Sequence, residues 1–186
     1  MNGVVLVEGR SDQAALEALA RRHGRELGAE GVAVVAMGGA QAIRRFLDRF
    51  GPHGLDVRLA GLCDAGEEDD FRRGLERAGL GPVRRRVELE RLGFYVCDAD
   101  LEDELIRAHG VASLERIAEA EGDLGPFRTL QKQPAWRERP PAEQFRRFLG
   151  AGARRKTRYA RLLVEELELE RMPAPLEGAL AASRPC

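Results

Sequence analysis

The first twelve residues, MNGVVLVEGRSD (residues 1–12), indicate the fold class of this chain. The apolar run VVLV ends at a glycine turn, as expected for a buried strand, and the following stretch AALEALARR is typical of a helix. We therefore predict a strand over residues 3–8 and a helix over residues 12–24, with Ser11 as its N-cap. Glu8 then lies at the carboxyl end of the strand, on the edge where open α/β sheets bind their ligands.

The same alternation of strand and helix continues to about residue 109. Further strands are expected over residues 32–37, 55–63 and 94–97, and further helices over residues 41–50, 67–78 and 98–109. This order predicts an α/β fold with a four-stranded, mainly parallel, Rossmann-like sheet that is flanked by helices and joined by right-handed crossovers.

The rest of the chain has a different pattern. Helices are expected over residues 111–122, 141–149 and 153–168, separated by segments that contain proline. We therefore predict three parts: an α/β core over residues 1–110, a helical extension over residues 111–172, and a loose tail over residues 173–186 with at most a short turn at 176–182. Phe148 and Tyr159 occupy apolar helical positions and are expected in the core of the extension.

Composition narrows the range of functions. The 186 residues carry a formal charge of −1, so contact with nucleic acid requires a local basic patch. The apolar runs are too short to cross a bilayer, and the N-terminus lacks the pattern of a signal peptide. Cys63, Cys97 and Cys186 show no metal-ligand spacing, which favours a reducing cytoplasm and free, buried thiols. Only Lys132 and Lys156 among the 30 basic residues are lysines.

Acidic residues follow three of the predicted strands. The clusters are Glu8 with Asp12, Asp64 with Glu67 and Glu68, and Asp100 with Glu102 and Asp103. All carboxyl ends of a parallel sheet lie on one edge, so these clusters can converge there. Converging carboxylates repel unless a cation joins them, and oxygen-only ligands select Mg²⁺ or Mn²⁺. Two such ions about 3.5–4 Å apart can clamp the attacking and leaving oxygens of a phosphodiester.

Each cluster also has a purely structural interpretation. Asp12 and Asp100 are suited to stabilising or capping helix N-termini, and Asp64-Ala65-Gly66 is suited to a turn. Glu8 has no such use directly after four apolar strand residues. The coincidence of three clusters at three strand ends favours a metal site.

In their order along the chain, these residues resemble the Toprim domain of topoisomerases, bacterial primases and OLD-family nucleases, and the OLD type most. Glu8 and Asp12 match the first motif, Asp100-Leu101-Glu102 matches a D-L-E motif, and the stretch KTRYA (residues 156–160) matches a late basic helix. The stretches LQKQP (130–134) and EQFRRFLG (143–150) resemble stand-alone Toprim proteins described as nucleotidyl transferase/hydrolase domains. The resemblance covers residues 3 to about 168.

The resemblance implies metal-dependent cleavage of DNA phosphodiesters with two Mg²⁺ or Mn²⁺ ions. Glu8 and Lys156 would be catalytic, and Lys156 would place positive charge near the reacting phosphate. The implied metal ligands are Glu8, Asp12, Asp64, Asp100 and Glu102, and the implied nucleic-acid-binding residues are Arg154, Arg155 and Arg158. A solvated surface lysine is the competing interpretation of Lys156.

The sequence departs from the family in two ways. The usual second motif is Asp-x-Asp, whereas this chain has Asp64-Ala65-Gly66, so Glu67 or Glu68 would have to substitute for the second acid. OLD nucleases carry an ATPase domain before the Toprim part, whereas this sequence has no G-x-x-x-x-G-K-[ST] loop. We therefore expect DNA as the substrate and a separate ATPase subunit as a further partner, in the cytoplasm and away from membranes.

Two other functions stay open on the sequence. Gly66 favours a non-catalytic module that binds nucleic acid or a partner with an incomplete site. A primase-like nucleotidyl transferase would use the same metals. The basic run Arg84–Arg86 would fit either a nucleic-acid backbone or a solvated loop.

Overall fold

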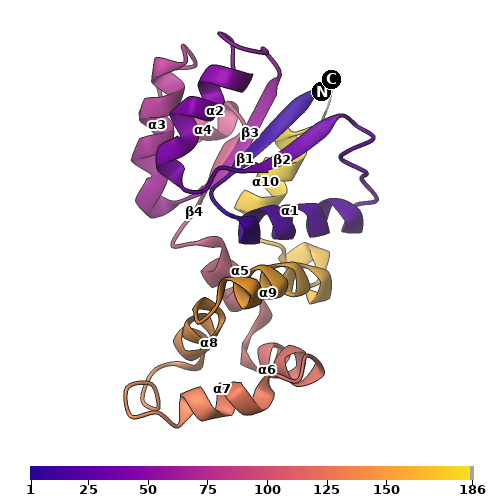
Figure 1. Ribbon diagram of the computed structural model, residues 1–186, viewed down its shortest axis with the longest axis vertical. Helices are drawn as coiled ribbons and strands as arrows, with labels where there is room; N and C mark the ends of the chain where they lie inside the picture. The colour runs from indigo at the N-terminus through magenta and orange to yellow at the C-terminus, as the bar shows by residue number, and fades with distance from the viewer. Residues whose placement is uncertain (185–186) are drawn as a thin grey trace.

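The computed structural model describes residues 1–184, and its centre is a four-stranded sheet in the order β2-β1-β3-β4 (Figure 1). The strands are β1 (Gly3–Val7), β2 (Val32–Ala36), β3 (Arg58–Asp64) and β4 (Phe94–Cys97). Every pairing is parallel, and Val5 of β1 lies opposite Val34 of β2 and Ala60 of β3. The predicted α/β fold with a four-stranded sheet is therefore confirmed.

Strand β1 lies inside the sheet and has helices on both of its faces. Val5 and Val7 belong to the core beneath α1, whereas Val4 and Leu6 belong to the core on the opposite face. All four side chains are buried. A continuous apolar strand is what a parallel sheet covered on both faces requires.

The helices form two layers on the sheet (Figure 1). One face carries α2 (Ile43–Phe50), α3 (Glu68–Arg77) and α4 (Arg86–Arg91), and the other carries α1 (Arg10–Arg22) and α10 (Ala174–Ala182). Single 3-10 turns cover Ala40–Ala42, Ala65–Glu67 and Leu169–Arg171.

The remaining helices, α5 of the predicted core and those of the extension, lie together at one end of the sheet (Figure 1). They are α5 (Leu101–His109), α6 (Val111–Ala120), α7 (Leu124–Gln131), α8 (Pro141–Gly150) and α9 (Ala153–Glu166). Phe127, Phe145, Phe148 and Tyr159 form its aromatic centre, with Phe127 and Phe145 rings 5.1 Å apart. The expected burial of Phe148 and Tyr159 is confirmed. Helix α9 packs along α1 and so joins the extension to the α/β core.

Three local expectations were wrong. Helix α1 begins at Arg10, so Ser11 lies inside the helix and is not its N-cap; Asp12 instead accepts a hydrogen bond from the N–H of Gly9, at 2.8 Å. Helix α7 was not predicted because Gly125-Pro126 suggested a break, but the proline occupies the first helical turn, where its missing N–H leaves no bond unmade.

The third wrong expectation is the loose tail. Residues 174–182 form helix α10, whose Leu176, Ala179 and Leu180 are buried. Packing against β3 and β4 holds this helix in place. Its nine residues are too few for the sequence pattern alone to predict a stable helix.

Cys63 and Cys97 are free and buried, as expected, and burial raises the pKa of both thiols. Cys186 lies outside the described residues. Within residues 1–184, no helix combines the length and apolar character that crossing a membrane requires.

Candidate active site

The structure places acids from three chain segments at the carboxyl edge of the sheet. Glu8 follows β1, Asp64 is the last residue of β3, and Asp100 lies between β4 and α5. The backbone N–H of Asp64 donates a hydrogen bond to Oε1 of Glu8, at 3.0 Å. This bond fixes Glu8 next to the end of β3, although 56 residues separate the two in the chain.

Three of the acids lie at the N-terminal ends of helices. Asp12 lies in the first turn of α1, and Asp100 caps α5 by accepting a hydrogen bond from the N–H of Asp103, at 2.8 Å. Both therefore have the structural role that the sequence left open. Glu102, in the first turn of α5, has no capping bond and is only 4% exposed. Burial of a carboxylate is costly, so Glu102 requires another explanation.

The pKa values show that the acids lie close enough to oppose one another's ionisation. Burial, together with the charge of Glu102, raises the pKa of Asp12 to about 7. Burial also raises the pKa of Asp64 to about 8, with contributions from the charges of Glu8, Asp12 and Asp100. The pKa of Glu8 is raised chiefly by burial. A cation at this edge would relieve the repulsion and favour the ionised carboxylates.

Lys156 extends from α9 into this acidic edge. Its Nζ lies 3.2 Å from Oε2 of Glu102, and its side chain is about half exposed. Burial lowers the pKa of Lys156, but the charges of Glu102, Asp12 and Asp100 more than compensate, so the pKa is raised overall. The ammonium group is therefore charged and lies among the acids, which is not the environment of a freely solvated surface lysine.

A pocket of about 290 Å³ lies beside this pair, lined by Asp100, Glu102, Arg146, Gly150 and Lys156 among others. Arg146 forms an ion pair with Asp100. No local signal in the sequence links these two residues, because α8 and the start of α5 are brought together only by the extension. Arg146 is thus a residue at the edge that the sequence analysis missed.

Two observations bear on whether a metal ion fits. Oε1 of Glu102 is buried and has no hydrogen-bond partner in the described part of the chain, which is the condition of a free ligand oxygen. Across residues 1–184, however, no three acidic, histidine or cysteine side chains converge closely enough to enclose an ion. An open, oxygen-only edge of this kind fits Mg²⁺ or Mn²⁺, which keep several water ligands and need only one or two carboxylates each.

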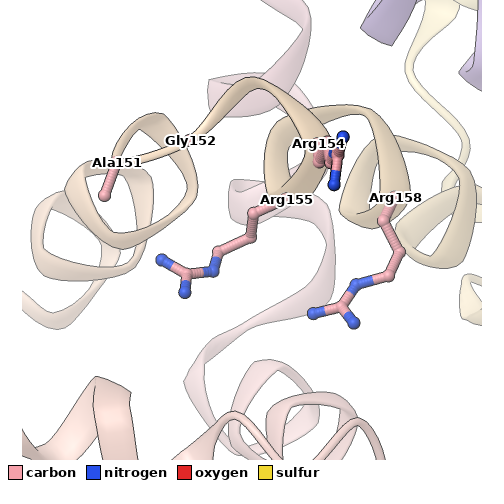
Figure 2. Close-up of a pocket in the computed structure, with 5 residues that line it drawn as sticks. All are labelled: Ala151, Gly152, Arg154, Arg155 and Arg158. Atoms are coloured by element: carbon pink, nitrogen blue, oxygen red, sulfur yellow. The ribbon is translucent and has the colours of Figure 1, made fainter.

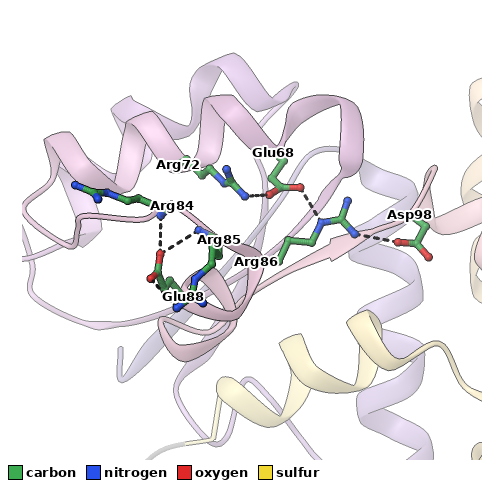
Figure 3. Close-up of polar contacts among 7 residues, drawn as sticks. All are labelled: Glu68, Arg72, Arg84, Arg85, Arg86, Glu88 and Asp98. Carbon is green, nitrogen blue, oxygen red and sulfur yellow. Dashed lines mark hydrogen bonds and ion pairs between the residues drawn. The ribbon is translucent and has the colours of Figure 1, made fainter.

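Two acids after Asp64, Glu67 and Glu68, could replace the missing second acid of the Asp-x-Asp motif. The structure places them in different surroundings. Gly66 is exposed, and a Cβ at this position would meet no atom within 4 Å. The charge of Glu67 raises the pKa of Glu8, so Glu67 lies near the acidic edge. Glu68 instead forms ion pairs with Arg72 and with Arg86, the latter at 2.8 Å (Figure 3).

The residues of the run Arg84–Arg86 form ion pairs and hydrogen bonds within the α/β core. Arg86 bridges Glu68 and Asp98, with N–O distances of 2.8 and 3.0 Å, and so ties α3 to the segment after β4 (Figure 3). The backbone N–H groups of Arg84 and Arg85 both donate to Glu88. Arg86 is therefore engaged within the protein.

The three arginines at the start of α9 differ in their surroundings. Figure 2 shows Arg155 and Arg158 extending to the same side of the helix. The guanidinium of Arg155 stacks 4.2 Å from the centre of the Phe148 ring, and Arg158 forms an ion pair with Asp123. Arg154 is exposed and, among the residues that the structure describes, has no hydrogen-bond or ion-pair partner.

Comparisons with known proteins agree with this arrangement. Residues 1–65 match the family model described as "Overcoming lysogenization defect protein-like, TOPRIM domain". No curated protein matches the sequence. Among solved structures, the C-terminal region of the Burkholderia pseudomallei OLD protein is 21% identical, with a TM-score of 0.72 and coverage of 98% of this chain and 96% of that chain.

The C-terminal region of the Xanthomonas campestris pv. campestris OLD protein is similar to the same extent. It is 22% identical, with a TM-score of 0.75 and coverage of 98% of this chain and 94% of that chain. Residues 1–65 therefore resemble the Toprim domain of OLD-like proteins, and the chain as a whole has the fold of these C-terminal regions.

Proposed function

We propose that this chain cleaves DNA phosphodiesters with the help of Mg²⁺ or Mn²⁺, as an OLD-type Toprim nuclease. The observation that supports the proposal is the gathering of acids with a single lysine at the carboxyl edge of the sheet. Glu8 is tied to Asp64 there, and Lys156 reaches Glu102 from another part of the fold. DNA is proposed as the substrate from the resemblance of the motifs to OLD-family Toprim nucleases, and the chain has the fold of the C-terminal regions of OLD proteins.

The residues divide into two roles under this proposal. The metal would be held by Glu8, Asp12, Asp64, Asp100 and Glu102. A divalent cation bound there would polarise the phosphate and lower the pKa of a water molecule. Lys156 holds positive charge at the same edge, where it would face the charge that develops on the phosphate in the transition state. Arg146 restrains Asp100 through their ion pair.

A non-catalytic binding module is the second candidate function. Gly66 supports it, because no carboxylate occupies the position where the usual second motif has one. The acidic edge would then be retained as part of the fold, while the basic residues of α9 would bind nucleic acid or a partner. Nucleotidyl transfer would require the same acids, with a sugar hydroxyl in place of water.

The test is nicking of supercoiled plasmid DNA with Mn²⁺ or Mg²⁺, comparing the wild type with Glu8→Gln. Glutamine keeps an oxygen that can accept the hydrogen bond from Asp64 but removes the charge that would bind metal. We expect nicking to fall by at least about 100-fold, since several kcal/mol of transition-state stabilisation would be lost. Glu119→Gln, an exposed acid on α6, is the matched control and should nick at the wild-type rate.

Three other outcomes would each contradict the nuclease proposal. Equal nicking by Glu8→Gln and the wild type would assign the activity to a contaminant or to another site. DNA binding without cleavage at any metal concentration would favour the binding module. Extension of a labelled DNA end with nucleoside triphosphates would favour the transferase.

A further inference from the structure

A groove of about 430 Å³ lies between α1 and α9. Its lining includes Arg10 and Ala14 from α1, and Arg154, Thr157, Arg158 and Arg161 from α9. None of the described residues that line it is acidic. We call it the arginine groove.

Two of its four arginines have no partner among residues 1–184. Arg158 is neutralised by Asp123, and Arg161 by Glu165 at 2.7 Å. Arg10 and Arg154 are exposed, and within the described chain neither forms a hydrogen bond or an ion pair. Most arginines in this protein are paired, so two unpaired guanidinium groups in one groove form a local positive patch on a chain with almost no net charge.

The arginine groove and the acidic edge are formed by the same N-terminal turns of α1 and α9. Arg22, near the end of α1, donates to the carbonyl of Val164 near the end of α9, at 2.8 Å, so the two helices run in the same direction. Arg10 lies two positions from Asp12, and Arg154 lies two positions from Lys156. Residues two apart on a helix point to nearly opposite sides. Asp12 and Lys156 therefore face the acidic edge, while the two arginines face the groove.

We propose that the arginine groove binds the phosphodiester backbone of the DNA strand that continues from the acidic edge. Arg10 and Arg154 each contact one phosphate. This inference rests on the proposed action on DNA, and it adds the direction in which the strand leaves the reacting phosphate. Guanidinium groups suit this role because their planar fork matches two phosphate oxygens. Contacts of this kind position a strand without reading its sequence.

The experiment measures binding of a labelled DNA duplex by fluorescence anisotropy in EDTA, at several salt concentrations. Absence of divalent metal separates binding from cleavage. We expect Arg10→Ala and Arg154→Ala each to weaken binding several-fold and to reduce the slope of log K against log salt by about 1, because one phosphate contact is lost. The double variant should lose about 2 in slope. Arg10→Lys and Arg154→Lys keep the charge and should keep the slope.

Arg77→Ala is the matched control. Arg77 is an exposed arginine at the end of α3, also without a partner among the described residues, and its removal should change neither affinity nor slope. Wild-type affinity and slope in the double variant would overturn the inference and leave the groove to an acidic protein partner. Failure of the wild type to bind DNA would also overturn it. If only the nuclease proposal is wrong, DNA binding will still depend on Arg10 and Arg154, but no metal will support nicking.

Discussion

At the scale of single residues, the acidic edge lacks the second carboxylate of the usual Asp-x-Asp motif, and an acid after Gly66 has to replace it. Glu67 and Glu68 are neighbours, but their surroundings differ. The charge of Glu67 acts on Glu8, and within residues 1–184 no ion pair or hydrogen bond restrains its side chain. Glu68 is held between Arg72 and Arg86. Glu67 is therefore the residue that can turn toward a cation.

We predict that Glu67→Gln slows metal-dependent nicking by about 10- to 100-fold, a loss typical of removing a group that supports a metal site. The loss should shrink at high Mn²⁺ concentration. Glu68→Gln removes two ion pairs and should lower the melting temperature instead. Nicking rates measured across a Mn²⁺ titration, alongside thermal melts, distinguish the two. Equal nicking rates for both variants would contradict this assignment.

At the scale of elements, α10 completes the layer over β3 and β4. It approaches the sheet closely at Gly178, where an added Cβ would lie 2.2 Å from the ring of Tyr95. A glycine inside a helix normally weakens it. Here its lack of a side chain allows the helix to reach the sheet, so the tertiary contact outweighs the helix propensity.

We predict that Gly178→Ala lowers the free energy of unfolding by about 1–3 kcal/mol, since the methyl group overpacks this contact. Gly125→Ala in α7 is the matched control. A Cβ at Gly125 meets no atom within 4 Å, so this change should be neutral or should stabilise by up to about 1 kcal/mol. Chemical denaturation of both variants is the measurement. Stabilisation by Gly178→Ala would show that α10 is not seated as described.

At the scale of the whole molecule, the acidic edge links stability to pH. The pKa of Asp12 is raised to about 7 and that of Asp64 to about 8, chiefly by burial, from an ordinary value of 3.8. The folded protein therefore holds protons that the unfolded chain releases. Stability from these groups is present at acidic pH and is lost as pH rises through their folded pKa values. Glu30 and Glu88, whose pKa values are lowered, have the opposite dependence below about pH 5, and His109, whose pKa is lowered by burial, has it below about pH 6.5.

We predict that the metal-free protein loses thermal stability between pH 5.5 and pH 8.5. Asp64→Asn should melt at a higher temperature than the wild type at pH 8.5, by about 2–4 °C for each kcal/mol recovered. Mn²⁺ should stabilise the wild type more at pH 8.5 than at pH 5.5, because protons compete with the metal. Melting curves at both pH values, with Mn²⁺ or EDTA, check this. If the Asp64→Asn variant is less stable than the wild type at pH 8.5, ionisation of Asp64 does not destabilise the folded protein and the prediction is wrong.

The amino-acid sequence by itself indicated the four strands and most of the helices, though not α4, α7 or α10, and it indicated which acids follow the strands. Apolar runs, glycine turns and acids at strand ends are local patterns, and a parallel sheet brings all carboxyl ends to one edge. Only the tertiary structure decided that Glu68 serves Arg72 and Arg86 while Glu67 lies near Glu8. It also decided that α10 joins the sheet and that Arg10 and Arg154 line one groove. These facts depend on contacts between residues far apart in the chain, and no local pattern carries that information.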